Sequence, residues 1–272
     1  MPQGRGSNGD AVKARIHLIA GARPNFMKIA PLWHALARAG ERFEVAVVHT
    51  GQHYDDEMSD VFLRQFNLPR PHYALGAGGG SHAEQTAAVM TAYERVCVSD
   101  RPDWVIVVGD VNSTMAATLA AKKLKLSVAH LEAGLRSFDR TMPEEINRLV
   151  TDALADLLWT PSPDGDANLL REGIPPGRID RVGNIMIDAF EMLRDDIAAS
   201  RWPLRHGLAE GAFAVVTLHR PSNVDDPERL AALVGTLERI ARRLPLVLPL
   251  HPRAAFPWPY PARAMTFLKM RP

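Results

Sequence analysis

The feature that most constrains the fold is a regular alternation between short apolar runs and amphipathic segments. The apolar runs are rich in valine, isoleucine and leucine, which is typical of buried strands, and the segments between them have the period of a helix. Strands that alternate with helices of about 10–15 residues predict an α/β fold with a parallel, doubly wound sheet. The predicted strands are 15–22, 44–51, 104–110, 127–134, 157–162 and 179–184, and the predicted helices are roughly 26–39, 55–67, 82–99, 112–124, 143–157 and 164–172.

The alternation of strands and helices becomes irregular near residue 190 and resumes near residue 211. A strand at 213–220, a helix at 226–243 and a strand at 245–252 begin a second α/β domain, but the proline-rich stretch after residue 253 has no helical or strand period. Two strands and one helix make less than half of a doubly wound domain, so we expect a truncated second domain. The predicted organisation is a disordered N-terminus at 1–14, an N-terminal Rossmann-like domain at 15–190, a crossing segment at 191–210, a partial C-terminal Rossmann-like domain at 211–253 and an atypical tail at 254–272.

Composition narrows the class of partner. Apolar residues make up 46% of the chain, and 32 Lys and Arg against 31 Asp and Glu leave a formal net charge of +1. That balance argues against a nucleic-acid partner, although a local anion site stays open. No apolar run approaches the ~20 residues of a membrane span, so we expect a soluble, cytoplasmic protein with no membrane partner. The single cysteine, Cys97, excludes an intrachain disulfide and a cysteine-cluster metal site, and its apolar neighbours predict that it is buried.

Charged and polar residues follow nearly every predicted strand. Open parallel sheets bind ligands beyond the carboxyl ends of their strands, so these residues are expected along one rim. The candidates are Arg23 and Lys28 after the first strand, Gln52 after the second, Asp110 after the third, Glu132 and Arg136 after the fourth, and His219, Arg220 and His251 in the second domain.

The stretch MPEEINR predicts the start of a helix with a chemically unusual face. Pro143 needs no amide partner in a first turn, and the acids after it suit the positive end of the helix dipole. An apolar stripe is predicted to face the core, while Glu144, Asn147 and Arg148 fall on the opposite face. These polar residues form either a solvated ion pair, worth about 0.3–0.5 kcal/mol, or part of a ligand site. The stripe consists of Ile146, Leu149, Val150, Ala153, Leu154 and Leu157.

Several familiar catalytic motifs are absent from the sequence. There is no G-x-G-x-x-G after the first strand, no Walker-type loop, no G-x-S-x-G elbow and no recognisable metal-ligand set. What remains is cations, helix N-termini and carboxylates, which suit a substrate with phosphates and a step that moves a proton. The missing motifs argue against dinucleotide or ATP binding in those modes.

Six segments in order resemble one family: GARPNFMK, HTGQHYD, VVGDVNST, HLEAGLRSFDRTMPEEINR, VGNIMID and TLHRPSN. From about residue 15 to about residue 253 the chain is similar to the non-hydrolysing UDP-N-acetylglucosamine 2-epimerases. The resemblance implies a GT-B-type fold of two Rossmann-like domains with the nucleotide sugar between them, and a homodimer. It also implies inversion at C2 to UDP-N-acetylmannosamine: UDP is eliminated to give a 2-acetamidoglucal and is then added back, without nicotinamide or metal.

The resemblance implies roles for the rim residues. Asp110, Glu132 and Glu144 would share the acid–base work, and the sequence does not resolve which one removes the proton. Two further catalytic residues, Lys28 and His219, would hold the pyrophosphate or leaving oxygen together with Arg23, and Arg148 would fix Glu144 and contact the ligand. The full set of expected substrate-binding residues is Arg23, Gln52, Arg136, Arg148, Arg220 and His251.

The chain departs from the family pattern in its second domain. The S-G-G-x-x-E-E segment that grips uridine and phosphates, and the final helix that braces the first domain, do not occur in the sequence. Two alternatives therefore stand beside an epimerase: a catalytically impaired remnant of one, and a GT-B glycosyltransferase. The paired EAGLRSFD and PEEINR motifs favour an epimerase over the glycosyltransferase.

Overall fold

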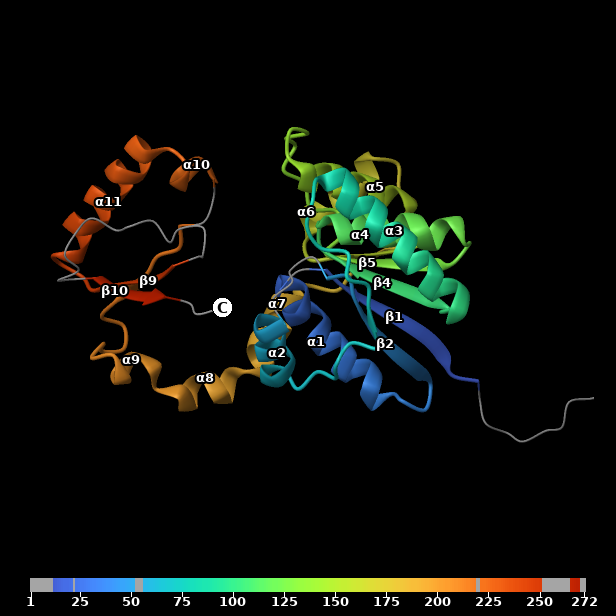
Figure 1. Cartoon of the computed structure of the whole chain (residues 1–272), viewed down its shortest axis with the longest axis horizontal. Helices are drawn as coiled ribbons and strands as arrows, with labels where there is room; N and C mark the ends of the chain where they lie inside the picture. Colours follow the sequence, from blue (N-terminus) through green and yellow to red (C-terminus); the bar gives the residue numbers. More distant parts are fainter. Residues whose placement is uncertain (1–11, 22, 52–55, 219–220, 251–264, 270–272) are drawn as a thin grey trace, which may run out of the picture. The chain divides into compact units, whose positions relative to one another are not determined.

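The computed structural model describes residues 12–21, 23–51, 56–218, 221–250 and 265–269 (Figure 1). The chain divides into two compact units, the first ending at Arg194 and the second beginning at Asp195. This division falls inside the predicted crossing segment 191–210, whose own limits stay a prediction. Each unit is described by itself below.

The first unit is built on a seven-stranded sheet in which all paired strands are parallel. Its order is β3-β2-β1-β4-β5-β6-β7, so the direction of winding reverses between β1 and β4. This confirms the predicted doubly wound sheet and makes the β1/β4 crevice the place where such folds bind ligands. The strands are β1 (Ala14–Ala20), β2 (Phe43–His49), β3 (Tyr73–Ala74), β4 (Trp104–Val108), β5 (Ser127–Leu131), β6 (Leu157–Thr160) and β7 (Ile179–Arg181).

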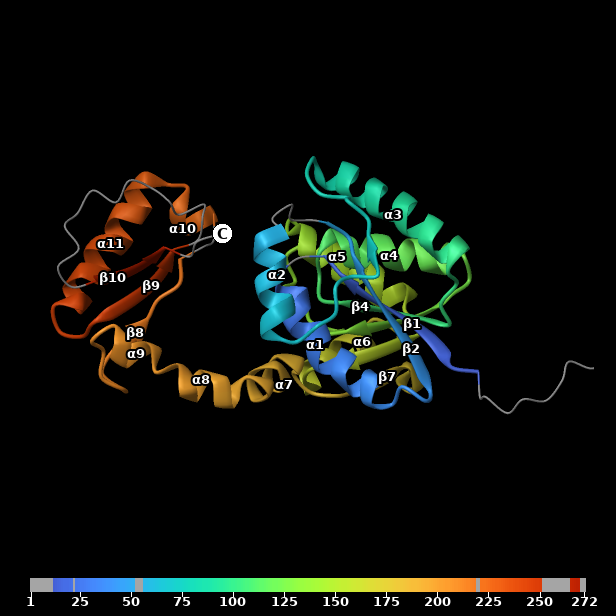
Figure 2. The same ribbon diagram turned by 60° about the horizontal axis from the view of Figure 1, so that its bottom comes forward.

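Helices cover both faces of this sheet (Figure 2). Successive strand residues point to opposite faces, so Leu18 packs in one apolar core under α1, α2 and α7, and Ile19 packs in the other under α3, α4 and α6. Cys97 is fully buried in the second core, as predicted. The helices are α1 (Arg23–Arg38), α2 (Asp56–Gln65), α3 (His82–Ser99), α4 (Asn112–Lys123), α5 (Pro143–Leu154), α6 (Pro163–Arg171), the 3₁₀ turn η1 (Pro176–Arg178) and α7 (Ile185–Met192).

The orientation of α5 corrects the sequence prediction. Its apolar stripe does not face the core: Ile146 is 42% exposed, Ala153 is exposed, and Leu149, Val150 and Leu154 are half-buried. The buried residues of the helix are instead polar: Glu145, Asn147, Thr151 and Asp152. The periodicity correctly separated an apolar face of α5 from a polar face. It could not show that the interior of the domain contains polar groups that form hydrogen bonds with the polar face.

The second unit contains a parallel three-stranded sheet in the order β10-β9-β8. The strand β10 (Met265–Lys269) lies within the segment that was expected to lack strand structure, so that expectation was wrong. Prolines obscured the short apolar run MTFLK, which pairs with an edge that would otherwise be open. The other elements are α8 (Arg194–Ser200), α9 (Trp202–Arg205), β8 (Ala214–Val215), α10 (Pro221–Val224), α11 (Pro227–Ala241) and β9 (Leu246–Leu250).

Across the described ranges, none of the helices combines the length and the apolar character that a bilayer crossing requires.

Candidate active site

The turns after β1 and β4 are tied together by a buried asparagine. Asn25, in the first turn of α1, accepts a hydrogen bond from the Gly21 amide at 3.1 Å and donates one to the Val108 carbonyl at 3.2 Å. One side chain thus fixes the two sides of the β1/β4 crevice relative to each other. Asn25 was not among the predicted site residues, although it lies inside the GARPNFMK segment.

An ion pair between Lys28 and Glu132 lies at the same rim. Lys28 comes from α1 and Glu132 follows β5, and their side chains are 17% and 13% exposed. Gly109, which follows β4, makes room for the pair: a Cβ there would lie 3.3 Å from Lys28 Nζ and 3.5 Å from Glu132 Oε2. Gly109 has a φ of +69°, a left-handed conformation that glycine adopts without strain. The structure therefore brings together residues from three strand ends.

A second ion pair joins Asp110 to Arg148. Arg148, from α5, contacts Asp110 with Nη2 and Glu145 Oε2 with Nη1 at 3.2 Å. The neighbouring Asn147 donates to the Asp110 backbone carbonyl at 2.8 Å. The polar face of α5 thus points at the turn after β4, and a solvated ion pair is not its role.

Glu145 holds the loop between β5 and α5. Its carboxylate accepts hydrogen bonds from the Ser137 and Phe138 amides at 2.9 and 3.1 Å, and its side chain is 3% exposed. Burial alone would raise the pKa of Glu145, but these amides and Arg148 outweigh it and hold the pKa below its usual range. An ionised carboxylate therefore fixes the loop, including Phe138 with its left-handed φ of +60°.

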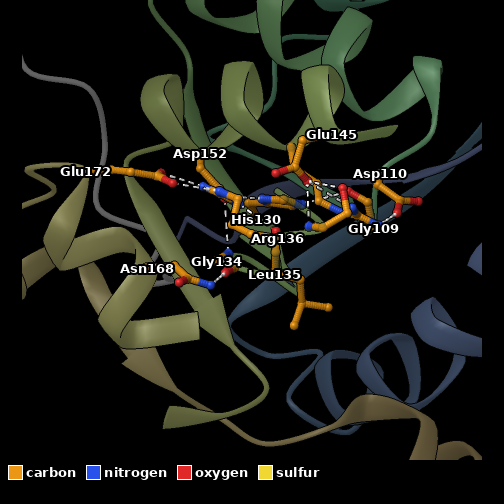
Figure 3. Close-up of polar contacts among 12 residues, drawn as sticks. Gly109, Asp110, His130, Gly134, Leu135, Arg136, Glu145, Asp152, Asn168 and Glu172 are labelled. Atoms are coloured by element: carbon orange, nitrogen blue, oxygen red, sulfur yellow. Dashed lines mark hydrogen bonds and ion pairs between the residues drawn. The ribbon is translucent and has the colours of Figure 1, made fainter. Parts of the chain in front are cut away.

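A chain of four charged or ionisable side chains, three of them buried and the last, Glu172, at the surface, runs beneath the rim (Figure 3). His130 Nε2 lies 2.8 Å from the Gly109 carbonyl, and its Nδ1 lies 2.6 Å from Asp152 Oδ1. Arg136 pairs with Asp152 Oδ2 at 2.7 Å and with Glu172 Oε2 at 2.6 Å. Burial alone would raise the pKa of Asp152, but His130 and Arg136 outweigh it and lower the pKa. The chain links the end of α6 to the turn that carries Asp110.

Three of the expected residues have surroundings that differ from the expectation. Arg148 contacts Asp110 and Glu145 rather than Glu144. Glu144 is half-buried in the first turn of α5 and makes no hydrogen bond or ion pair within the described residues. The Arg136 side chain is 1% exposed and its guanidinium is occupied by Asp152 and Glu172, so this geometry gives no support to a ligand contact.

Other expected residues fall outside what the structure describes. Arg23 begins α1, but its side chain is not described. Gln52, His219, Arg220 and His251 lie outside the described residues. Their roles stay predictions.

Three buried polar residues that support the rim, Glu145, Asp152 and His130, were not among the predicted site residues. Glu145, Arg148 and Asp152 are spaced i, i+3 and i+7, so a polar stripe on one helix face was visible in the sequence. His130 was less visible, because it is one polar residue inside an apolar strand. Within the described ranges, no three His, Cys, Asp or Glu side chains are arranged to hold a metal ion. The rim can therefore offer carboxylates for proton transfer and cations for an anionic group.

Known proteins are similar to this chain in both sequence and fold. A family model described as UDP-N-acetylglucosamine 2-epimerase matches residues 34–257. A UDP-N-acetylglucosamine 2-epimerase homolog from Methanococcus maripaludis is 40% identical over 241 residues, which cover 88% of this chain and 66% of the relative. A UDP-2,3-diacetamido-2,3-dideoxy-D-glucuronate 2-epimerase from Pseudomonas aeruginosa is 42% identical over 243 residues, which cover 88% of this chain and 67% of the relative.

A solved structure extends the likeness to three dimensions. Methanocaldococcus jannaschii UDP-GlcNAc 2-epimerase, crystallised in complex with UDP-GlcNAc and UDP, matches with a TM-score of 0.77 and 40% identity, over 88% of this chain and 67% of that chain. The solved structures that this chain resembles are GT-B-type epimerases and glycosyltransferases, which confirms the predicted fold class. The chain spans about two thirds of the length of the relatives it matches.

Proposed function

The chain belongs to the UDP-N-acetylglucosamine 2-epimerase family, and we propose that it interconverts UDP-N-acetylglucosamine and UDP-N-acetylmannosamine by inversion at C2. The observation that carries this proposal is the meeting of two ion pairs, Lys28–Glu132 and Asp110–Arg148, on the turns after β4 and β5. Carboxylates and cations at one rim match the demands of a proton transfer next to a phosphate leaving group.

The proposed reaction runs through elimination and re-addition. A base takes the C2 proton, the C1–O bond breaks, and UDP leaves with the electron pair, which gives the 2-acetamidoglucal. An acid then protonates C2 on the opposite face while UDP returns to C1. Two faces require at least two proton-carrying groups, and we assign these among Asp110, Glu132 and Glu144.

The cations serve the leaving group in this proposal. Lys28 lies beside Glu132 near the amino end of α1, where a cation and the positive end of the helix dipole both favour developing phosphate charge. Arg148 is the second described cation, and Arg23 and His219 are proposed to join Lys28 on the pyrophosphate. Gln52, Arg220 and His251 are proposed to bind substrate, whereas Arg136 is reassigned to support the rim from beneath.

A related sugar is the second candidate substrate. The Pseudomonas aeruginosa relative is named for UDP-2,3-diacetamido-2,3-dideoxy-D-glucuronate and is 42% identical to this chain. The same C2 chemistry would apply to it, because both sugars carry an acetamido group at C2 and UDP at C1. Parallel assays with the two nucleotide sugars distinguish them.

Deuterium exchange tests the reaction directly. The purified chain is incubated with UDP-N-acetylglucosamine in deuterated water, and the C2 proton and the manno product are followed by NMR. We expect deuterium at C2 together with the manno sugar. No exchange over hours at high protein concentration would favour the impaired remnant instead.

Glu144→Gln is the sharpest variant for this assay. Because Glu144 has no hydrogen bond or ion pair within the described residues, the variant should stay folded while the exchange is abolished. Asp164→Asn is the matched control, since Asp164 is also the second residue of a helix that begins with proline, and it is exposed. Equal exchange in Glu144→Gln and the wild type would remove Glu144 from the mechanism.

The outward face of α5 supports a homodimer. Ile146, Val150 and Leu154 form an apolar strip that the first unit does not cover completely, and Ile146 is 42% exposed. Apolar strips of this kind on soluble proteins mark interaction sites. A second copy of the chain would bury the strip against itself around a twofold axis.

A further inference from the structure

The ring of His130 faces two hydrogen-bond acceptors. His130 lies on β5, is fully buried, and points to the sheet face covered by α4 and α5. Its Nε2 is 2.8 Å from the Gly109 carbonyl oxygen and its Nδ1 is 2.6 Å from Asp152 Oδ1 (Figure 3). A carbonyl oxygen only accepts hydrogen bonds, so Nε2 carries a proton.

The surroundings of Asp152 place the other proton on Nδ1. Besides His130, the carboxylate accepts from the Gly134 amide at 3.0 Å and from Arg136 Nη1 at 2.7 Å. These two donors, one of them a cation, favour the ionised carboxylate, which only accepts, so Nδ1 must also donate. A ring that donates from both nitrogens is an imidazolium.

The charges around the ring balance. Asp152 from α5 faces His130, Arg136 from the loop after β5 faces Asp152, and Glu172 at the end of α6 faces Arg136. In the sheet, His130 is flanked by Val107 and Leu158, and the buried residues of α4 are uncharged. Two positive and two negative groups therefore alternate along a chain that begins in the interior at His130 and reaches the surface at Glu172.

We propose that His130, protonated on both ring nitrogens, is a positioning residue for the C2 epimerisation. Through Asp152 it joins the turn of Gly109 and Asp110 to the turn of Glu132 and Gly134, and so sets the spacing between two of the proposed acid–base carboxylates. This inference rests on the proposed function.

The backbone of both turns explains why such a link is required. Glu132 has a φ of +70°, which costs free energy for any residue with a side chain, and Gly109 and Gly134 are left-handed as well. Such conformations persist only where surrounding contacts hold them. The His130 and Asp152 hydrogen bonds to the Gly109 carbonyl and the Gly134 amide are those contacts.

The protonation state is tested first, without turnover. The full chain is labelled with ¹⁵N-histidine, and the His130 ring signal is identified by its loss in His130→Gln. At neutral pH we expect two ring N–H protons on His130, both protected from solvent exchange. A His130 ring with a single N–H would overturn the proposal.

The Asp152→Asn variant then tests the role of the charge, because it removes the carboxylate charge and keeps the shape of the side chain. The new amide can donate to Nδ1 of a neutral ring while its oxygen accepts from Gly134 and Arg136, so every hydrogen bond keeps a partner. We expect one ring N–H on His130, weaker protection of the Gly134 amide, and kcat lowered about tenfold with KM changed less than about twofold. The control is Asp156→Asn, which removes a carboxylate that pairs with Lys122 and should leave kcat unchanged.

The readouts distinguish the failure of each proposal. If Asp152→Asn neutralises the ring but leaves kcat and the Gly134 amide unchanged, the positioning role is wrong and the epimerase assignment stands. If the wild type shows no C2 exchange with either nucleotide sugar, the proposed function fails. The ring protons and the Gly134 amide then still decide whether the link exists.

Discussion

At the scale of single residues, the geometry of the rim depends on glycines as well as on charged side chains. Gly134 has a φ of +78°, and a Cβ there would lie 2.4 Å from the Gly165 carbonyl oxygen. A backbone oxygen at the start of α6 cannot move aside as a flexible side chain can. The turn after β5 thus packs against α6 without space for any larger residue.

Gly134→Ala should therefore destabilise the first unit by about 2–4 kcal/mol, through steric overlap added to backbone strain. Urea unfolding measures the loss. Gly173→Ala is the matched control, because Gly173 has a φ of +84° but nothing within 4 Å of an added Cβ. Similar losses in the two variants would mean that backbone conformation alone, and not the contact with Gly165, requires glycine at position 134.

The adjacent residues Glu144 and Glu145 of α5 show that a sequence motif does not by itself identify which of two neighbouring acids has buried partners. The sequence drew attention to Glu144 and left Glu145 aside, yet Glu145 is the one that accepts hydrogen bonds from three groups of the preceding loop and from Arg148. The helical period placed Glu144 on one face with Asn147 and Arg148, and the resemblance to a family then implied a catalytic role for it. Buried partners, which determine the role of Glu145, become visible only in the folded chain.

At the scale of elements, the alternation of strands and helices predicted the first unit well. Each of the six predicted strands is present, and all but β7, where Asp180 and Arg181 are exposed, are apolar runs. A capping box at Ser81 and Glu84 opens α3. The two-residue β3 was missed because it is too short to have a period. The prediction also placed the carboxyl ends of β1, β4 and β5 at one rim, and the structure brings Lys28, Asp110 and Glu132 there.

The buried and exposed faces of α5 were predicted the wrong way round, because an amphipathic pattern does not show which of the two faces is buried. A helix with one apolar and one polar face usually buries the apolar one. Here His130, the Asp110 turn and two loop amides form hydrogen bonds with Asp152, Asn147 and Glu145 of the polar face, which allows that face to be buried although the Thr151 hydroxyl has no partner within the described residues. The apolar face stays partly exposed on the first unit, and we propose that a second copy of the chain covers it.

Ile146→Glu tests that partner. We expect the variant to fold as the wild type does, because Ile146 is 42% exposed, and to sediment as a monomer under conditions where the wild type is a dimer. Ile187→Glu on α7 serves as the control, since that isoleucine is 60% exposed on the opposite face of the sheet and should leave the dimer intact. A wild type that sediments as a monomer, or an Ile146→Glu dimer, would show that α5 does not form the interface.

At the scale of the whole molecule, the two units were predictable to different degrees. The first has a complete sheet whose helices bury both faces, so its sequence pattern and its structure agree. The second was predicted as an incomplete domain, and the strand Met265–Lys269 adds to its sheet without appearing in the pattern. Pairing of a short segment with a distant edge depends on the edge that is available, which a local pattern does not contain.

The end of the sheet away from the rim gives the first unit a dependence on pH. His17 is fully buried, with Nδ1 3.1 Å from the Tyr93 hydroxyl and Nε2 3.3 Å from Asp100 Oδ2. Burial lowers the pKa of His17 and outweighs the opposing hydrogen bond to Asp100. Unlike His130, this ring faces one hydroxyl that can donate, so its neutral form satisfies both neighbours.

Stability should consequently fall with acidification through His17. Because the folded pKa lies below the unfolded value of about 6.5, the unfolded chain binds the proton first, and stability is lost as pH falls below about 6.5. His17→Gln removes this titration, so the difference in unfolding free energy between wild type and variant should shrink between about pH 7.5 and about pH 5.5. Urea unfolding across that range measures the difference, with the exposed His206→Gln as the control. A difference that stays constant with pH would show that His17 titrates alike in the folded and unfolded chain, and the buried contact with Tyr93 and Asp100 would then not restrict its protonation.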